Sequence, residues 1–214
     1  MAVFKFFLLF FIHFLILPTS AFPQGSRTGK VVDILSEYIA SPEFGLTRIN
    51  SGEPASVDSI FSAALRFSGG DISLALSACT WTCLTVKTAT VVTPILGTKL
   101  VIPFFSTDDL TFAAKNKNLP RYFFEDSPVS SSGDIDKLAH FFGSAYLQYN
   151  SFIPGIVELF GYFIEVFEES FKVDSKFSAR DIIVNKIGIK FGNELREKPE
   201  AKPSDFLKQY KIEK

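Results

Sequence analysis

Cysteine and histidine are scarce in this chain of 214 residues, which contains two of each. Cys79 and Cys83 lie four residues apart, so a helix would place them on one face. A strand would hold them roughly 13 Å apart, too far for a local disulfide. A metal pair would need further Cys or His side chains close by. We therefore predict that both cysteines are small buried residues.

An excess of positive charge is also absent, since 22 Lys and Arg residues stand against 23 Asp and Glu residues. This balance excludes the basic footprint of a nucleic-acid-binding protein, so we predict no nucleic-acid partner. The sequence lacks a phosphate-binding loop, an HExxH zinc motif and a nucleophile elbow. No motif therefore names a reaction, and we predict no cofactor and no metal ion.

The N-terminus carries the pattern of a signal peptide. Lys5 precedes the apolar run Phe6 to Leu17, and small residues follow as far as Ala21. Such a run is short for a bilayer-spanning helix, which takes about 17 to 25 residues. The alternative to a cleaved signal peptide is that this segment is retained as an N-terminal membrane anchor. No Cys follows the run, so no signal-linked lipid anchor is encoded. We predict a signal peptide over residues 1–21, cleavage after Ala21, and an exported protein that is periplasmic or peripheral to a membrane.

The rest of the chain predicts an α+β fold dominated by helices. Residues 22–133 form an N-terminal region of unknown type, 134–195 a three-helix module, and 196–214 a charged, solvated tail. In the N-terminal region we expect helices over Val31–Ala40 and Ser56–Phe67, the latter ended by Gly69-Gly70. A β-hairpin is expected from Leu84–Thr93 and Thr98–Phe105. Residues 72–83 fit helix or strand, whereas 42–54 and 108–133 are predicted as loops.

Polar residues recur at helical spacing within the C-terminal module. Its helices are predicted over 136–149, 154–171 and 178–195. The candidate site residues are Asp136, Lys137, His140, Glu165, Asp181 and Asn185. An Asp at i and a His at i+4 can meet, as when a carboxylate orients a base. Each residue also has an ordinary role to weigh against this: a capping Asp, a solvated Lys, a core His, a Glu on a wet face, and a first-turn Asp181.

Two glycines continue the face of Asp181 and Asn185 along the third helix. Gly188 and Gly192 are four residues apart, a spacing that permits close approach of a second helix. We expect a neighbouring backbone to come near Asn185, whose amide can both donate and accept a hydrogen bond.

These motifs resemble those of the predicted periplasmic lipoprotein family of the YfiM type, and more distantly those of VanZ-like membrane proteins. The matching residues, in 136–192 only, are Asp136-Lys137-x-x-His140, Gly161-x-x-x-Glu165 and Phe177-Ser178-x-x-Asp181-x-x-x-Asn185-x-x-Gly188-x-x-x-Gly192. The resemblance implies a small helical module of the cell envelope. The chain departs from it by lacking a lipoprotein Cys and by having Glu168-Glu169 where VanZ-like proteins place a Gln.

Two functions are consistent with these patterns. The first is a non-enzymatic envelope module whose helices 137–150 and 154–171 form a shallow hairpin, with membrane lipid or another envelope protein as partner. The alternative is a hydrolase acting on a lipid or cell-wall substrate, with His140 as general acid or base beside Asp136 and Glu165. Lys137 and Asn185 would then stabilise an anion. His140, Glu165 and Asp181 alone are a thin set for zinc.

Overall fold

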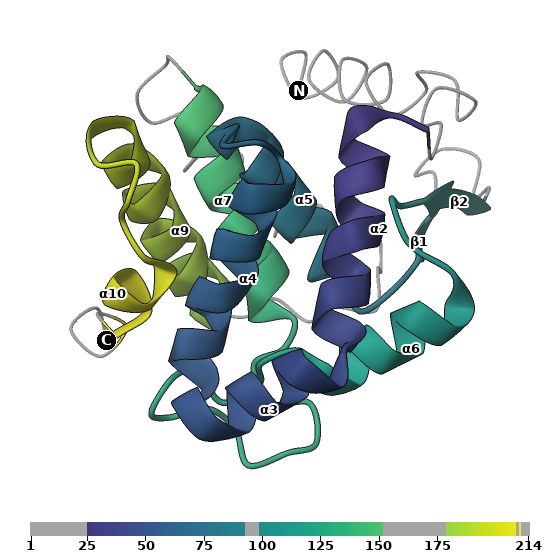
Figure 1. Ribbon diagram of the computed structural model, residues 1–214, viewed down its shortest axis with the longest axis horizontal. Coiled ribbons are helices and arrows are strands. Elements are labelled where there is room, and N and C mark those ends of the chain that lie inside the picture. The colour runs from purple at the N-terminus through teal and green to yellow at the C-terminus, as the bar shows by residue number, and fades with distance from the viewer. Residues whose placement is uncertain (1–24, 93–98, 152–178, 209, 211–214) are drawn as a thin grey trace.

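The computed structural model of the chain describes residues 25–92, 99–151, 179–208 and 210 (Figure 1). Within them the fold is dominated by helices and carries one two-stranded antiparallel sheet, which confirms the predicted α+β class. The predicted signal peptide and the predicted helix 154–171 lie outside the described residues. The elements are α2 (Arg27–Ala40), α3 (Pro42–Ser51), α4 (Glu53–Phe67), α5 (Ile72–Thr82), β1 (Thr88–Val92), β2 (Lys99–Pro103), α6 (Asp109–Asn118), α7 (Lys137–Asn150), α9 (Ala179–Glu197) and α10 (Pro203–Leu207).

The first two predicted helices are present as α2 and α4, and both begin earlier than expected. The Ser26 hydroxyl accepts a hydrogen bond from the Gly29 amide and starts α2. Helix α4 begins at Glu53, so the predicted cap Ser56 instead lies in its first turn, where its hydroxyl donates to the Gly52 carbonyl. Gly69 and Gly70 adopt positive φ after α4 and end the helix as predicted.

Two segments predicted as loops are helical, and this is a correction. Helix α3 occupies residues 42–51, where Ser41 accepts a hydrogen bond from the Phe44 amide and Pro42 fills a first-turn position. Proline is compatible with that position because its missing amide hydrogen would have no helical partner. Helix α6 arises in the same way, since the Asp108 carboxylate accepts from the amides of Leu110 and Thr111.

The segment left open between helix and strand is helix α5. The Asp71 carboxylate caps it by accepting a hydrogen bond from the Leu74 amide at 3.0 Å. The hairpin prediction is confirmed, because β1 and β2 pair antiparallel with Thr88 opposite Pro103. Figure 1 shows this hairpin at the edge of the molecule, beside α2 and α6.

One hydrophobic core joins the N-terminal helices to α7 and α9. Phe191 of α9 lies 5.2 Å from Phe61 of α4 and 5.3 Å from Phe141 of α7, measured between ring centroids. Cys79 and Cys83 are free and fully buried in the same core, as predicted. Among the described helices, none has the length and hydropathy that crossing a membrane requires.

The segment after α9 is not the solvated tail that its charge suggested. Leu207 and Tyr210 are buried, and α10 packs against α4 and α9. The Asp58 carboxylate of α4 accepts hydrogen bonds of 2.7 Å from the Ser204 amide and from its hydroxyl. The correction has a simple cause: apolar residues stand between the charges at helical spacing and reach the core.

Candidate functional site

Helices α7 and α9 touch backbone to backbone at two glycines. A Cβ atom added to Gly188 would collide with the carbonyl oxygen of Phe141, and one added to Gly192 would collide with that of Ala145. Only glycine leaves room for this contact. The close helix approach predicted from the Gly188-x-x-x-Gly192 spacing is therefore confirmed.

Side-chain hydrogen bonds run along the same helix pair. The Ser144 hydroxyl donates to Asn185 Oδ1 at 2.9 Å, and Gln148 Nε2 donates to Asn193 Oδ1 at 2.6 Å. Asn185 is buried, so its amide needs such a partner. Near the end of α9, Arg196 Nε donates to the Tyr149 carbonyl at 3.1 Å. These bonds fix the register of α9 against α7.

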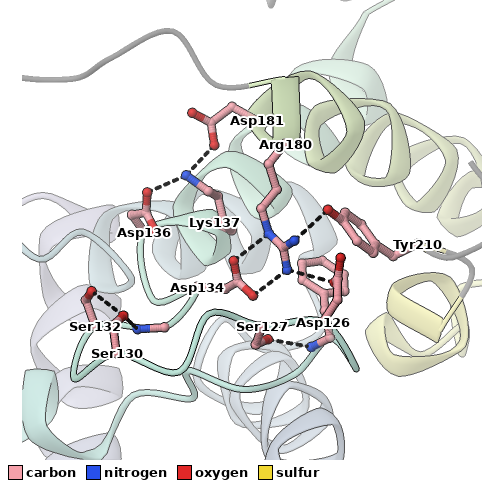
Figure 2. A network of polar contacts seen from close by, with 12 residues as sticks. Asp126, Ser127, Ser130, Ser132, Asp134, Asp136, Lys137, Arg180, Asp181 and Tyr210 are labelled. Atoms are coloured by element: carbon pink, nitrogen blue, oxygen red, sulfur yellow. Dashed lines mark hydrogen bonds and ion pairs between the residues drawn. The ribbon is translucent and has the colours of Figure 1, made fainter. Parts of the chain in front are cut away.

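At the start of the two helices, Lys137 lies between two carboxylates (Figure 2). Its ammonium group is 2.5 Å from Asp136 Oδ2 and also forms an ion pair with Asp181. The side chains of Lys137 and Asp181 are 10% and 8% exposed, whereas that of Asp136 is 54% exposed. Burial by itself would lower the pKa of Lys137, but hydrogen bonds to Asp136 and Asp181 outweigh it and raise the pKa. Lys137 is thus held protonated.

The capping role weighed for Asp136 is corrected here. Asp136 occupies the N-cap position of α7, yet it makes no side-chain capping hydrogen bond. Its carboxylate pairs with Lys137 instead. Asp181 lies in the first turn of α9, as expected, and its carboxylate spans the gap to α7.

A second ion pair adjoins the first and is formed by Arg180 and Asp134. Arg180 Nε and Nη2 donate to the two oxygens of Asp134 at 2.6 and 2.7 Å, a bidentate arrangement. The Asp134 side chain is 1% exposed. Arg180 also donates to Asp126 Oδ1 at 3.1 Å and to the Tyr210 hydroxyl at 2.7 Å. Figure 2 shows the guanidinium group at the centre of these partners.

The environment of Arg180 keeps its charge fixed. Burial would lower the pKa of the guanidinium group, but the hydrogen bonds to Asp134 and Asp126 raise it above its ordinary value. Two aromatic rings cover the group, with centroids 5.2 Å (Phe124) and 4.5 Å (Tyr210) from Cζ. Cations are attracted to such ring faces.

A glycine turn aims Asp134 into the protein. Gly133 has φ +53°, and a Cβ atom there would collide with the Arg121 carbonyl oxygen. The Asp134 amide donates to that same carbonyl at 2.8 Å. The turn therefore holds the backbone of Asp134 against residue 121 and leaves its carboxylate to face Arg180.

Of the six candidate residues, Asp136, Lys137 and Asp181 meet in one ion-paired cluster, and Asn185 lies further along α9. His140 is half-buried on α7, one turn after Lys137. Glu165 lies outside the described residues, so its predicted pairing with His140 stays a prediction. Among the residues that the structure describes, no group of three or more His, Cys, Asp or Glu side chains could hold a metal ion.

Neither Arg180 nor its partner Asp134 is among the residues that the sequence singled out. No local signal distinguishes Arg180, because α9 carries further charges such as Lys186 and Glu194 beside its core residues. Only the packing of α9 shows that the half-buried Arg180 meets a carboxylate from elsewhere in the chain.

As a whole, the cluster consists of protonated cations held by carboxylates. A general base must be free to accept a proton. Neither Lys137 nor Arg180 meets this requirement, because the raised pKa of each favours its charged form. The arrangement is suited to holding α7, α9, the preceding loop and Tyr210 in one geometry.

Comparisons with protein-family models, with curated proteins and with solved structures give no match for this chain.

Proposed function

We propose that this protein is a non-enzymatic module of the cell envelope, exported and either periplasmic or held at a membrane face. In this proposal its buried polar network fixes the packing of α7 and α9. The signal-peptide pattern of residues 1–21 and the resemblance of residues 136–192 to the YfiM type support the export and the compartment. The partner would be membrane lipid or another envelope protein.

The observation that carries the non-enzymatic part is the pairing within the network. Asp136 and Asp181 are bound to Lys137, and Asp134 is bound to Arg180. Removing one member of a buried pair leaves an uncompensated charge, which destabilises a protein by about 3 to 5 kcal/mol. Groups that are needed to satisfy one another in this way are poorly placed to exchange protons with a substrate.

Asn185, further along the contact between α7 and α9, supports the same conclusion. In the hydrolase alternative it would donate to an oxyanion. Its oxygen accepts from Ser144 of α7, and the buried side chain is enclosed in the contact between the two helices. Its position is that of a group that fixes helix register.

The hydrolase alternative depends on His140, so that residue is the one to test. Purified protein and its His140→Asn variant are incubated with phospholipid vesicles, with peptidoglycan and with nitrophenyl esters, and products are followed by mass spectrometry. The proposal expects no turnover that depends on His140. Turnover by the parent protein that the variant loses, with an unchanged melting temperature, would establish the hydrolase instead.

The compartment is tested separately. Membranes from cells that express a C-terminally tagged protein are extracted with alkaline carbonate. Protein that stays in the pellet is held by lipid, and protein that is released is peripheral or periplasmic. Retention of the tagged protein in the cytosolic fraction with residues 1–21 intact would contradict the proposed export.

A further inference from the structure

An open pocket of about 300 Å³ lies away from the polar network. Residues of α2 and α4 line it together with Lys202, which precedes α10. Figure 1 shows α4 between α2 and α10. This volume is at the lower end of the range for small-molecule sites. The polar residues that line it are Tyr38, Asp58, Ser59, Ser62, Arg66 and Lys202.

Arg66 differs from the other arginines of the described chain. Each of the others donates a hydrogen bond to a protein oxygen, namely Arg27, Arg48, Arg121, Arg180 and Arg196. Arg66 lies over the ring of Phe67, 4.9 Å from its centroid, and within the described residues its guanidinium group has no oxygen partner. Its donors are therefore available to a ligand in the pocket.

The other polar groups of the pocket are also available, with two exceptions. Across residues 25–92, 99–151, 179–208 and 210, Lys202 forms no ion pair, and the hydroxyls of Tyr38 and Ser62 bond no protein group. The exceptions are Ser59, whose hydroxyl donates to the Ala55 carbonyl at 3.0 Å, and Asp58, whose two oxygens accept from the amide and the hydroxyl of Ser204. In the part of the chain that the structure describes, the pocket therefore has two cations without an ion-pair partner, Arg66 and Lys202, and one acid, Asp58, which is already hydrogen-bonded.

We propose that this pocket binds a small hydroxylated organic anion. Arg66 and Lys202 hold its phosphate or carboxylate group, since charge-assisted hydrogen bonds to such groups are the strong ones. Tyr38 and Ser62 hydrogen-bond its hydroxyls. The Tyr38 ring is preorganised, because it packs edge-on against Phe44 at 5.4 Å and against Phe67 at 6.2 Å. A fixed ring loses little freedom when a ligand binds.

Glycerol 3-phosphate is the probe, because it combines a phosphate with two hydroxyls at a size that suits the pocket. Isothermal titration calorimetry on the full chain is expected to give a Kd of about 1 mM or tighter, with glycerol as the neutral control. Arg66→Gln and Lys202→Gln are each expected to weaken binding about tenfold, the usual effect of losing a hydrogen bond to a charged group. Arg66→Lys should lose less, because it keeps the charge.

Lys186→Gln is the matched control, since this lysine is exposed on α9 and lies outside the pocket. It should bind glycerol 3-phosphate as the parent protein does. No binding at 10 times the expected Kd of about 1 mM would overturn the proposal, as would binding that survives Arg66→Gln. Circular dichroism of each variant confirms that the fold is retained.

The same chemistry occurs on free metabolites and on lipid headgroups, and a second titration distinguishes these sources. Vesicles of phosphatidylcholine with and without phosphatidylglycerol are compared by co-sedimentation. Sedimentation that requires phosphatidylglycerol and Arg66 assigns the anion to a lipid surface. Binding of glycerol 3-phosphate alone assigns it to a soluble compound. Because neither Arg66 nor Lys202 belongs to the polar network, this site and the proposed structural role of that network succeed or fail separately.

Discussion

Asp134 and Arg180 are 46 residues apart in the chain, yet each oxygen of the Asp134 carboxylate accepts a hydrogen bond from a different nitrogen of the Arg180 guanidinium group. Asp134 belongs to the loop before α7, and Arg180 to the first turn of α9. Through Tyr210 the same guanidinium group reaches the segment after α10. Three parts of the chain thus depend on one cation.

Replacing Asp134 with Asn should therefore destabilise the protein severely. Asp134 is buried, and its loss leaves Arg180 largely uncompensated. We expect the free energy of unfolding to fall by about 3 to 5 kcal/mol, measured by urea denaturation. Asp126→Asn is the matched control, because its side chain is 32% exposed and pairs with the same arginine. The control should lose at most about 1 kcal/mol. Equal losses in the two variants would mean that the buried bidentate pair contributes no more to stability than the exposed pair.

Lys137 and Asp181 should show strong coupling in a double-mutant cycle. Lys137→Met leaves the buried Asp181 carboxylate without its partner and should cost roughly 3 kcal/mol, whereas Asp181→Leu leaves Lys137 paired only with the exposed Asp136 and should cost less. The double variant should lose clearly less than the sum, because two apolar side chains then face one another. Unfolding by urea measures all four proteins. Additive losses would show that the two charges do not depend on each other in the folded state.

Replacing glycine with alanine should have opposite effects on stability at the contact between α7 and α9 and in the open helix α3. Gly188→Ala should destabilise the protein by about 1 to 3 kcal/mol, because the added methyl group meets the backbone of α7. Gly45→Ala in α3 should stabilise it by up to about 1 kcal/mol, since alanine is the better helix former. Its Cβ would have only ordinary contacts, the nearest being 3.7 Å from Asn118. Thermal melts of both variants decide the matter.

A buried lysine and two buried thiols should give the stability a specific dependence on pH. Lys115 is 1% exposed, and its ammonium group donates to the Leu84 carbonyl at 2.9 Å. Burial lowers its pKa to about 8. Burial also raises the pKa of Cys79, and that of Cys83 to about 12. The unfolded chain keeps the ordinary values.

The signs of the two effects are opposite. Between about pH 8 and pH 10 the unfolded chain binds the Lys115 proton and the folded chain does not, so this group adds stability as the pH rises. Above about pH 8.5 the unfolded chain releases thiol protons that the folded chain keeps, so the cysteines remove stability. Cys79→Ala/Cys83→Ala should therefore gain stability relative to the parent protein on going from pH 8 to pH 9.5.

Adding Lys115→Met isolates the contribution of the lysine. From pH 8 to pH 9.5, the unfolding free energy of Cys79→Ala/Cys83→Ala should rise relative to that of the triple variant by roughly 1 kcal/mol per pH unit. Guanidinium denaturation at pH 8, 8.75 and 9.5 measures it. A difference that does not change with pH would show that Lys115 titrates near its ordinary pKa in the folded protein.

Local signals predicted most of the elements, and the two missed helices show where such signals fail. In α3 the residues Pro42, Gly45 and Asn50 looked like helix breakers, yet the first is favourable in the first turn and Ser41 caps it. Helix α6 has a low apolar content, so its periodicity was weak. Its Asp108 cap and the lysines in its last turn favour a helix through the backbone dipole instead.

The candidate site was predictable only where its members lie on one helix. The spacing of Gly188 and Gly192 correctly indicated a close approach, because both positions belong to α9. The buried partner of Lys137, Asp181, is 44 positions away, and no local periodicity connects the two residues. Long-range ion pairs depend on how helices pack, and a single sequence does not encode that packing in a short pattern.

The bond between Arg180 and Tyr210 bears on how the protein is made. Tyr210 follows Arg180 by thirty residues, and its ring stacks on Phe124 with centroids 4.2 Å apart. A domain generally folds as a unit, and its N-terminal residues are synthesised first. A nascent chain that ends after α9 lacks α10 and Tyr210. The side of Arg180 that Tyr210 covers, and the surface of α4 that α10 covers, are then exposed to water. The core of the described protein is therefore complete only once residues 203–210 have been added.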